Sequence, residues 1–227
     1  MPSGVRTERG VTVRRFPVAK PRSLTRFRDL SDRVFAFGSA PDDQVDWFRE
    51  NGPDTPALLE HLRARSEFEL HLILSAPARR TLAEETDLAV KDVEALAHVV
   101  HDNRDIGASV ASGSFRTRGM VIVPCTMKTA SALATGHADT LIARAGDVTL
   151  KEGRPLIAVV RETPLHLGHL RQLVALAEIG GIVLPPMPAF YNRPRTVDDI
   201  VDHTVARILD RLGIAQDLVP EWTGHRR

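Results

Sequence analysis

Residues 120–160 read MVIVPCTMKTASALATGHADTLIARAGDVTLKEGRPLIAVV, and this stretch decides the fold. It opens on an apolar run rich in β-branched residues, Met120–Pro124, and closes on another, Pro155–Val160. Two stretches of helical length, 128–136 and 140–153, lie between them. Runs that are apolar on both faces are typical of strands covered by helices. The stretch therefore predicts an α/β protein with a mostly parallel sheet.

The same alternation extends outward from this stretch in both directions. Two further strands are predicted, at Phe68–Leu74 and Gly181–Pro185. Further helices are predicted at 57–65, 77–85, 92–100, 167–180 and 197–213. No internal repeat is visible, so one domain accounts for the pattern.

Composition excludes several classes of protein. The 227 residues are 43% hydrophobic, enough for a core, and 30 Lys+Arg against 29 Asp+Glu give a net charge of +1. So balanced a charge disfavours a general nucleic-acid binder. No apolar run approaches the roughly 20 residues that span a bilayer, and a single Cys cannot form an intramolecular disulfide. We expect a soluble cytoplasmic protein without a membrane or nucleic-acid partner.

The N-terminal quarter differs from the remainder. Residues 1–33 carry nine Lys or Arg against three acids, with little helical periodicity. Only Val34–Gly38 resembles a strand. We therefore expect a divergent, irregular basic arm over 1–56 and the folded domain over 57–227.

Two loops that follow predicted strands carry polar residues suited to a ligand. In open α/β sheets, ligands bind beyond the carboxyl ends of the strands. The stretch Pro124–Ser131 places hydroxyls and amides at a helix start, which suits an anion or a flavin edge, or equally a simple helix cap. Arg161 and Glu162 follow the next strand and suit either a ligand or an ion pair at the sheet edge.

Two further loops have similar alternatives. Ala111–Phe115 reads ASGSF, which suits close approach by a phosphate or an ordinary turn. Pro185–Pro194 contains four prolines and Tyr191, the only Tyr of the chain. This loop predicts either a shaped wall whose phenol donates to an oxyanion, or a turn around a buried aromatic.

Histidine pairs and an acidic motif receive structural interpretations. The pairs His98/His101 and His166/His169 lie three residues apart on predicted helices but lack the further ligands of a zinc site. Cys125 has no neighbouring His and is interpreted as packing. Asp198, Asp199 and Asp202 spell DDxxD, a magnesium-diphosphate motif of all-helical prenyl synthases. Here the motif follows Thr196 at a predicted helix start, which favours helix capping, and no metal is expected.

Taken in order, the loops closely resemble the UbiX-type flavin prenyltransferases. The matching segments are LSAPARRTLAEETD (74–87), SGSF (112–115), MVIVPCTMKT (120–129), LIARAGDVTLKEGRPL (141–156), RETPLHLGHL (161–170), GGIVLPPMPAFYNRP (180–194) and DDIVDHTVARILDRLG (198–213). The resemblance runs from about Leu58 to the end. It implies a Rossmann-like (flavodoxin-like) doubly wound parallel sheet in a single domain.

The resemblance also implies an activity. A dimethylallyl group from dimethylallyl phosphate would be joined to reduced FMN across N5 and C6, giving the prenylated cofactor of a UbiD-type decarboxylase. The family assembles as dodecamers whose active sites are shared between subunits, so a homo-oligomer is expected. Flavin contacts are implied for Ser75, Thr126, Met127, Lys128, Thr129 and Arg161. The dimethylallyl phosphate cluster is implied for Ser112, Arg144, Lys151, Glu162, Tyr191 and Arg207, with Glu85 as a further polar residue of the site.

Elementary chemistry agrees with these roles. An allylic C–O bond ionises readily when cations and hydroxyls hold the departing phosphate, so no metal is required. Glu162 suits the acid/base role because phosphate gains a proton and the flavin carbon loses one. Trp222 matches a family aromatic whose face could shield an allylic cation. Glu162, Glu85 and Ser112 are thus the expected catalytic residues.

One family element is missing from the sequence. The family begins with a strand and a GxSGASG-type loop, whose N–H groups cradle the FMN phosphate, directly before the helix at ALLEHL. This chain has NGPDTP there, and Gly38-Ser39-Ala40 lies about ten residues too far upstream. Either that segment serves with an insertion, or another replaces it, or the N-terminal part is translated from a shifted frame.

Three functions follow from these observations. An active prenyltransferase is favoured by the complete phosphate cluster. A related flavin-dependent cysteine decarboxylase is disfavoured because RETPLHLGH and PAFYNRP match the transferase. A flavin-binding homologue without turnover is the third, because the Gly-rich loop is lost.

Overall fold

The computed structural model describes residues 4–8, 11–15, 55–65, 67–86, 88–219 and 224. The strands are β1 Gly4–Glu8, β2 Val11–Arg15, β3 His71–Leu74, β4 Val99–Asp102, β5 Met120–Cys125, β6 Leu156–Val160 and β7 Ile182–Val183. The helices are α3 Thr55–Arg63, α4 Ala76–Glu85, α5 Val90–Glu94, α6 Met127–Thr135, α7 Leu141–Lys151, α8 Leu167–Glu178 and α9 Val197–Arg211. Short 3₁₀ turns are η1 Ser109–Ala111 and η2 Phe190–Asn192.

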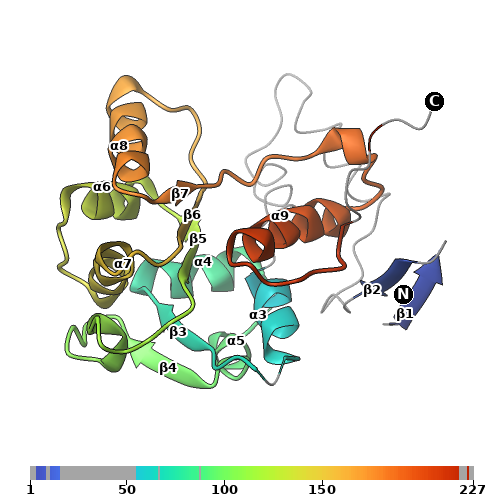
Figure 1. Ribbon diagram of the computed structural model, residues 1–227, viewed down its shortest axis with the longest axis horizontal. Coiled ribbons are helices and arrows are strands. Elements are labelled where there is room, and N and C mark those ends of the chain that lie inside the picture. Colours follow the sequence, from blue (N-terminus) through green and yellow to red (C-terminus); the bar gives the residue numbers. More distant parts are fainter. Residues whose placement is uncertain are drawn as a thin grey trace.

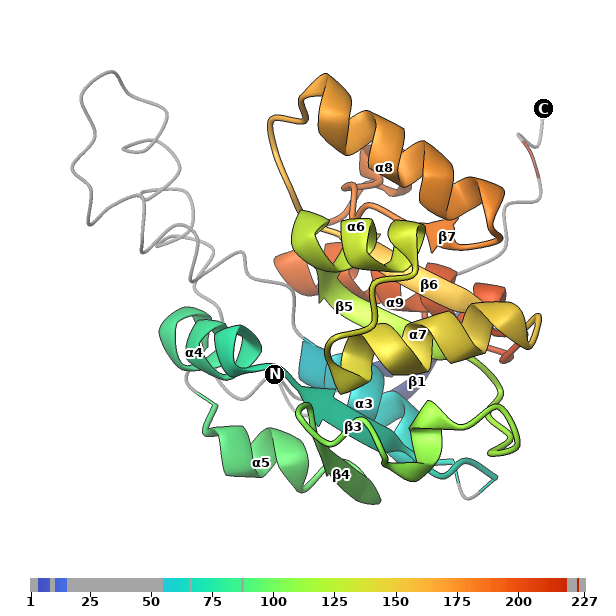
Figure 2. The ribbon, with the colours of Figure 1, turned by 90° about the vertical axis from the view of Figure 1, so that its left-hand side faces the viewer.

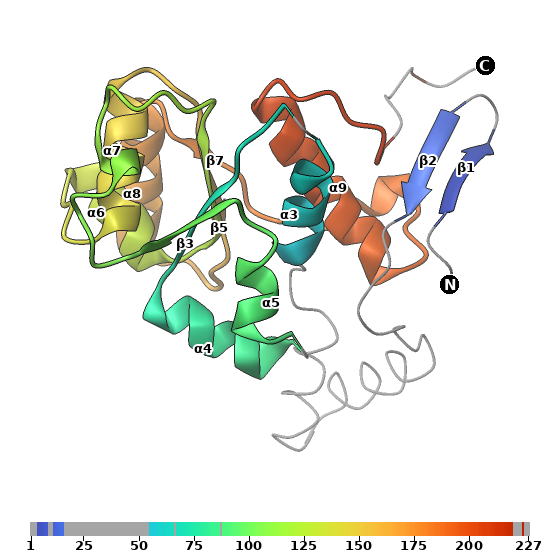
Figure 3. The same ribbon diagram turned by 90° about the horizontal axis from the view of Figure 1, so that it is seen from below.

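A parallel sheet of β5, β6 and β7 forms the centre, with β6 in the middle. Helices α6, α7 and α8 lie on one side, and α3 and α9 lie on the other (Figures 1 and 3). Every residue of β6 is buried, because its side chains alternate between the two layers. Leu156 and Ala158 pack toward the α6–α8 layer, while Ile157 and Val159 pack toward α3 and α9. The predicted α/β class with parallel strands is confirmed.

The remaining parallel strands form a separate pair. β3 and β4 pair in register from His71↔Val99 to Leu74↔Asp102, and no strand pairing among the described residues joins them to β5 (Figure 2). Ile73 of β3 and Met120 of β5 nevertheless pack against one common apolar cluster. The described ranges contain no strand in the place of the first strand that the resemblance implies. The nearest substitute, Val34–Gly38, lies outside the described residues.

Two local predictions were wrong. The predicted helix 92–100 ends at Glu94, and Val99 begins β4, because β-branched Val99 and Val100 pair with β3 in the sheet. The predicted strand Gly181–Pro185 shortens to β7, because prolines follow it and remove backbone donors. The basic arm also contains an antiparallel hairpin, in which Gly4 pairs with Arg15, where the sequence indicated no strand.

Side-chain caps fix where several helices begin. Ser75, Thr126 and Thr196 each accept a hydrogen bond from the backbone N–H three residues ahead. At α9 the cap is reciprocal, since Asp199 Oδ2 accepts from the backbone N of Thr196 at 3.0 Å. The capping interpretation of the acidic motif is therefore confirmed for Asp199. Within the described ranges, no helix combines the length and apolarity needed to cross a bilayer.

Candidate functional site

An ion pair organises the carboxyl edge of the central sheet. Arg161, the first residue after β6, donates from Nη1 and Nη2 to the two carboxylate oxygens of Glu85 at 2.9 and 3.0 Å. Its backbone N donates to the carbonyl of Cys125, the last residue of β5, at 3.2 Å. Two predicted site residues far apart in sequence are thus joined, and Glu162 follows in an exposed position. A carboxylate and a guanidinium at this edge can bind a polar planar ligand.

The predicted flavin contacts Thr126–Thr129 lie beside this pair at the start of α6. Thr126 Oγ1 accepts from the backbone N of Thr129 and lies 3.2 Å from its hydroxyl. Thr126 and Lys128 are exposed, whereas the side chain of Met127 is buried in the core. Met127 can therefore offer only backbone groups to a ligand. The helix-cap interpretation of this stretch is confirmed, and the cap leaves polar groups exposed at the helix start.

Ser75 occupies the equivalent position after β3. Its hydroxyl accepts from the backbone N of Ala78 at 3.1 Å and caps α4, the helix that ends at Glu85. Residues at both ends of α4 are thus predicted site residues. Ser75 is half-buried, so its oxygen retains some access to a ligand at the sheet edge.

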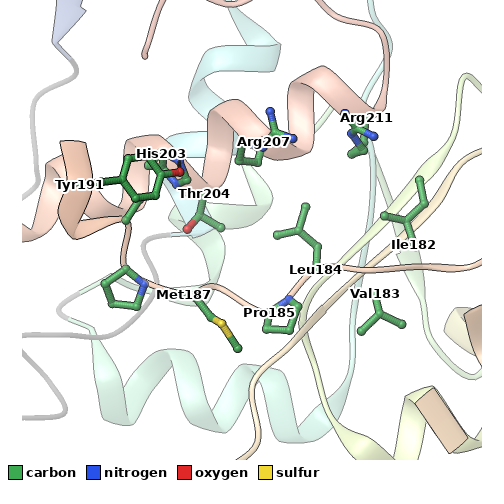
Figure 4. A pocket seen from close by; sticks show the side chains of 12 residues that line it. Ile182, Val183, Leu184, Pro185, Met187, Tyr191, His203, Thr204, Arg207 and Arg211 are labelled. Carbon is green, nitrogen blue, oxygen red and sulfur yellow. Dashed lines mark hydrogen bonds between the residues drawn. The ribbon is translucent and has the colours of Figure 1, made fainter. Parts of the chain in front are cut away.

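Tyr191 and Arg207 line one cavity of about 430 Å³ between the proline-rich loop and α9 (Figure 4). Leu184, Pro185 and Met187 supply apolar wall. Phe190 and Tyr191 are 72% and 74% exposed, so the alternative of a turn around a buried aromatic is wrong. Arg207 Nη1 donates to Asp210 at 2.8 Å on the same helix. A cavity with an apolar wall on one side and a phenol and two guanidinium groups, of Arg207 and Arg211, on its lining suits a small apolar group attached to an anion.

Ser112 and Lys151 lie at the opposite edge of the sheet. Ser112 Oγ lies 2.9 Å from Ser114 Oγ in the ASGSF loop. A Cβ built on Gly113 would lie 3.1 Å from Lys151 Nζ, so this loop packs on the last turn of α7. That turn leads directly into the amino end of β6, whereas Arg161 follows its carboxyl end. The five residues of β6 separate the two edges by roughly 15 Å.

Arg144 stands on α7 between these edges. Its Nη1 lies 3.5 Å from Asp147, and about 10 Å of helix separates it from Lys151. Apart from Arg144, the described part of one chain therefore brings the predicted residues into three groups rather than one. Glu85, Arg161 and the Thr126 segment form the first, Tyr191 and Arg207 the second, and Ser112 and Lys151 the third. Trp222 lies outside the described residues.

Two further residues were not singled out by the sequence. Arg154 donates to the carbonyls of Gly113 and Phe115 at 2.7 and 2.8 Å and so holds the ASGSF loop. His203 lines the cavity with Tyr191, its Nε2 3.4 Å from the Tyr191 hydroxyl. The only available signal for His203 was its spacing of four from Arg207, which places both on one helix face. Nothing local in the sequence indicates the role of Arg154.

The predicted histidine pairs and Cys125 have structural partners. His98 Nδ1 accepts from the backbone N of Leu70, and His166 Nδ1 accepts from that of His169. His101, expected on a helix with His98, lies instead on β4 and stacks on His71. Burial raises the pKa of Cys125 to about 12, so it is no nucleophile at neutral pH. Over the described ranges, no group of three His, Cys, Asp or Glu could hold a metal ion.

Comparison with known proteins gives one consistent result. Residues 53–209 match the family described as Flavoprotein. Flavin prenyltransferase UbiX of Escherichia coli K12 is 53% identical over 169 residues, which cover 74% of this chain and 89% of that protein. A probable UbiX-like flavin prenyltransferase of Streptomyces sp. strain D7 is 55% identical over 74% of this chain and 84% of its own length.

Solved structures agree with the sequence matches. AnUbiX, in complex with FMN and dimethylallyl pyrophosphate, superposes with a TM-score of 0.73 at 42% identity, over 75% of this chain and 90% of its own. A dodecameric FMN-dependent UbiX-like decarboxylase of Escherichia coli O157:H7 superposes with a TM-score of 0.72 at 48% identity, over 74% and 91%.

Proposed function

This chain belongs to the UbiX family of flavin prenyltransferases, and we propose that it joins the dimethylallyl group of dimethylallyl phosphate to reduced FMN. The observation that carries the proposal is the cavity shared by Tyr191 and Arg207. Its apolar wall suits a five-carbon chain, and its phenol and guanidinium suit a phosphate. The binding of FMN and dimethylallyl pyrophosphate by AnUbiX supports both ligands.

The carboxyl edge of the sheet would hold the flavin ring. Exposed Thr126 and Lys128 and the Arg161–Glu85 pair present donors and acceptors in one place, as a ring with several polar atoms requires. Ser75 adds a hydroxyl from the neighbouring strand end. The fit is incomplete for the FMN phosphate, because the sequence lacks the Gly-rich loop expected before residue 57. We therefore assign the ring contacts to these residues and no phosphate contact.

The donor C–O bond would break, and phosphate would depart with the electron pair. The allylic C1 would bond to N5 of the reduced flavin in place of the N5 hydrogen. The C=C π bond would be consumed as C3 bonds to C6 in place of the C6 hydrogen and C2 takes up the proton released from N5. Tyr191 and Arg207 would stabilise the negative charge on the departing phosphate. Exposed Glu162 would carry the proton that the flavin carbon loses and the phosphate gains. No redox step is needed once the flavin is reduced.

We further propose that the site is completed between copies of the chain. Ser112 and Lys151 lie about 15 Å of strand away from Arg161, so one copy cannot bring them to the same phosphate. Helix α8 exposes an apolar stripe at i, i+3 and i+7, with Leu167 60% and Val174 57% exposed. Such a stripe on a helix suits burial against another copy. The dodecameric state of the E. coli O157:H7 relative supports this assembly.

Anaerobic single turnover tests the function. Protein loaded with reduced FMN is mixed with dimethylallyl phosphate, and the extracted flavin is weighed by mass spectrometry. A gain of one dimethylallyl unit, transferable to a UbiD-type decarboxylase, is expected. Unchanged flavin that stays bound would favour the second candidate, an FMN-binding homologue without turnover, which the missing Gly-rich loop supports.

A further inference from the structure

His203 shares the cavity with the two residues proposed to hold the prenyl donor. It lies on α9 one turn before Arg207, and Figure 4 shows it beside Tyr191 at one end of the cavity. The rings of His203 and Tyr191 meet edge to face at 87°, with centroids 6.2 Å apart. The Tyr191 hydroxyl lies 3.4 Å from His203 Nε2. The imidazole is therefore the protein group that competes with a ligand for the phenol.

The surroundings of His203 favour its neutral form. Burial, followed by the positive charge of Arg207, lowers its pKa below the usual histidine value, and Asp210 partly opposes them. The other charged groups along this face of α9 are Arg211, which lines the same cavity, and Asp199, one turn before His203, whose carboxylate accepts from the backbone N of Arg195 and of Thr196. In the tautomer that leaves Nε2 without a hydrogen, a neutral imidazole that faces a phenol accepts the phenol proton. In this tautomer Tyr191 donates to His203 and not to the cavity.

We propose that His203 is a positioning residue that couples donor binding to uptake of a proton. When a dianion enters, the protonated imidazole turns Nε2 into a donor. The Tyr191 hydroxyl proton is then released from His203 and can point to the anion. One proton added to the imidazole thus places a further positive charge near the anion. It also lets the Tyr191 hydroxyl donate its hydrogen bond to the anion. The identity of the anion rests on the proposed function. The coupling between anion binding and protonation of His203 does not.

The sign of the pH effect follows from linkage. An anion beside His203 raises its pKa from the lowered value of the free protein. Between the two values the complex holds a proton that the free protein lacks, so the anion binds more tightly as the pH falls. Sulfate is the suitable probe, because it remains a dianion over this range whereas a phosphate monoester takes up a proton with a pKa of about 6.

The experiment measures sulfate affinity of the full-length protein by calorimetry between about pH 5.5 and 8.5. Wild type is compared with His203→Gln, which cannot titrate, and with His137→Gln, an exposed control in the loop before α7. The expected gain in affinity from high to low pH is about three- to tenfold in wild type and the control, and markedly less in His203→Gln. In His203→Gln, the KM for dimethylallyl phosphate should exceed that of wild type by a factor that grows toward low pH.

Two outcomes bear on the coupling. Equal pH dependence of sulfate affinity in wild type and His203→Gln would overturn it, whatever the activity. A difference between them in protein that shows no prenyl transfer would uphold the coupling and count against the proposed function alone. Thermal unfolding of each variant establishes that a lost response does not reflect lost folding.

Discussion

Arg161 and Glu85 meet in a two-pronged ion pair, with contacts of 2.9 and 3.0 Å, that ties the end of β6 to the end of α4. The two residues are 76 positions apart, and neither belongs to a helix cap. Both side chains are about one-third exposed, so the pair contributes little to stability by itself. The pair fixes the positions of a guanidinium and a carboxylate at the sheet edge where we propose that the flavin ring binds.

Replacing Arg161 by Ala should weaken FMN binding. Loss of charge-assisted hydrogen bonds of this kind costs about 1.5–3 kcal/mol, equivalent to roughly a 10- to 100-fold rise in Kd. Glu85→Gln keeps the shape and should weaken binding less. The matched control is Arg80→Ala, which breaks an exposed pair with Glu84 on the same helix. Fluorescence titration of apo protein with FMN gives the three constants, and equal Kd values for Arg161→Ala and Arg80→Ala would remove Arg161 from the flavin site.

Glu162→Gln and Tyr191→Phe should impair prenyl transfer while FMN binding stays nearly unchanged. Both groups are proposed to act on the proton and charge that move as phosphate departs. Loss of one such donor typically slows the chemical step about 10²- to 10³-fold. Anaerobic single-turnover rates provide the measurement, and FMN titration provides the control. Rates equal to wild type in both variants would contradict their assignment.

Asp199 should matter for stability and not for magnesium. Its carboxylate accepts from the backbone N of Arg195 at 2.7 Å and of Thr196 at 3.0 Å. Asp199→Ala should therefore lower the free energy of unfolding by about 1 kcal/mol, measured by urea denaturation. Asp199→Asn retains an acceptor oxygen and should recover most of that loss. A strict magnesium requirement for prenyl transfer would instead revive Asp198, Asp199 and Asp202 as ligands.

FMN should bind this chain less tightly than the fold alone suggests. The sequence lacks the Gly-rich loop, and each lost N–H contact to a phosphate is worth about 1.5–3 kcal/mol. Riboflavin, which has no phosphate, serves as the matched ligand. Its affinity should approach that of FMN. Submicromolar FMN binding with a large preference over riboflavin would mean that another segment cradles the phosphate.

The sequence predicted the layers of helices and sheet because a strand that is buried on both faces is apolar at every position. The run Leu156–Val160 is apolar throughout, and it became the fully buried central strand. The sequence assigns Val99 and Val100 to a helix over 92–100, because a short apolar run has no period of its own. Only pairing with His71–Leu74, far away in sequence, decides that it is a strand.

The candidate site was less accessible to sequence reasoning. Residues that directly follow strands, such as Arg161 and Thr126, could be placed together because parallel strands end at one edge. The contact between Arg154 and the carbonyl of Gly113 depends on a loop conformation that no local pattern encodes. Lys151 precedes β6 and Arg161 follows it, so the topology separates the two residues. The family resemblance, taken alone, implies that both act in one reaction.

Two inactive variants should restore activity to each other if the site is shared between copies. Lys151→Ala removes a cation from one edge of the sheet, and Arg207→Ala removes one from the cavity beside α9. In oligomers formed from an equal mixture after dissociation and reassembly, about a quarter of the interfaces pair two unaltered partial sites. The mixture should therefore recover about a quarter of wild-type turnover, while each variant alone remains slow.

The double variant Lys151→Ala/Arg207→Ala, reassembled with wild type, controls for the exchange of subunits. Native mass spectrometry verifies that the mixed oligomers contain both variants. If such a mixture shows no recovery of turnover, Lys151 and Arg207 belong to the site of the same copy, or Lys151 lies outside the site.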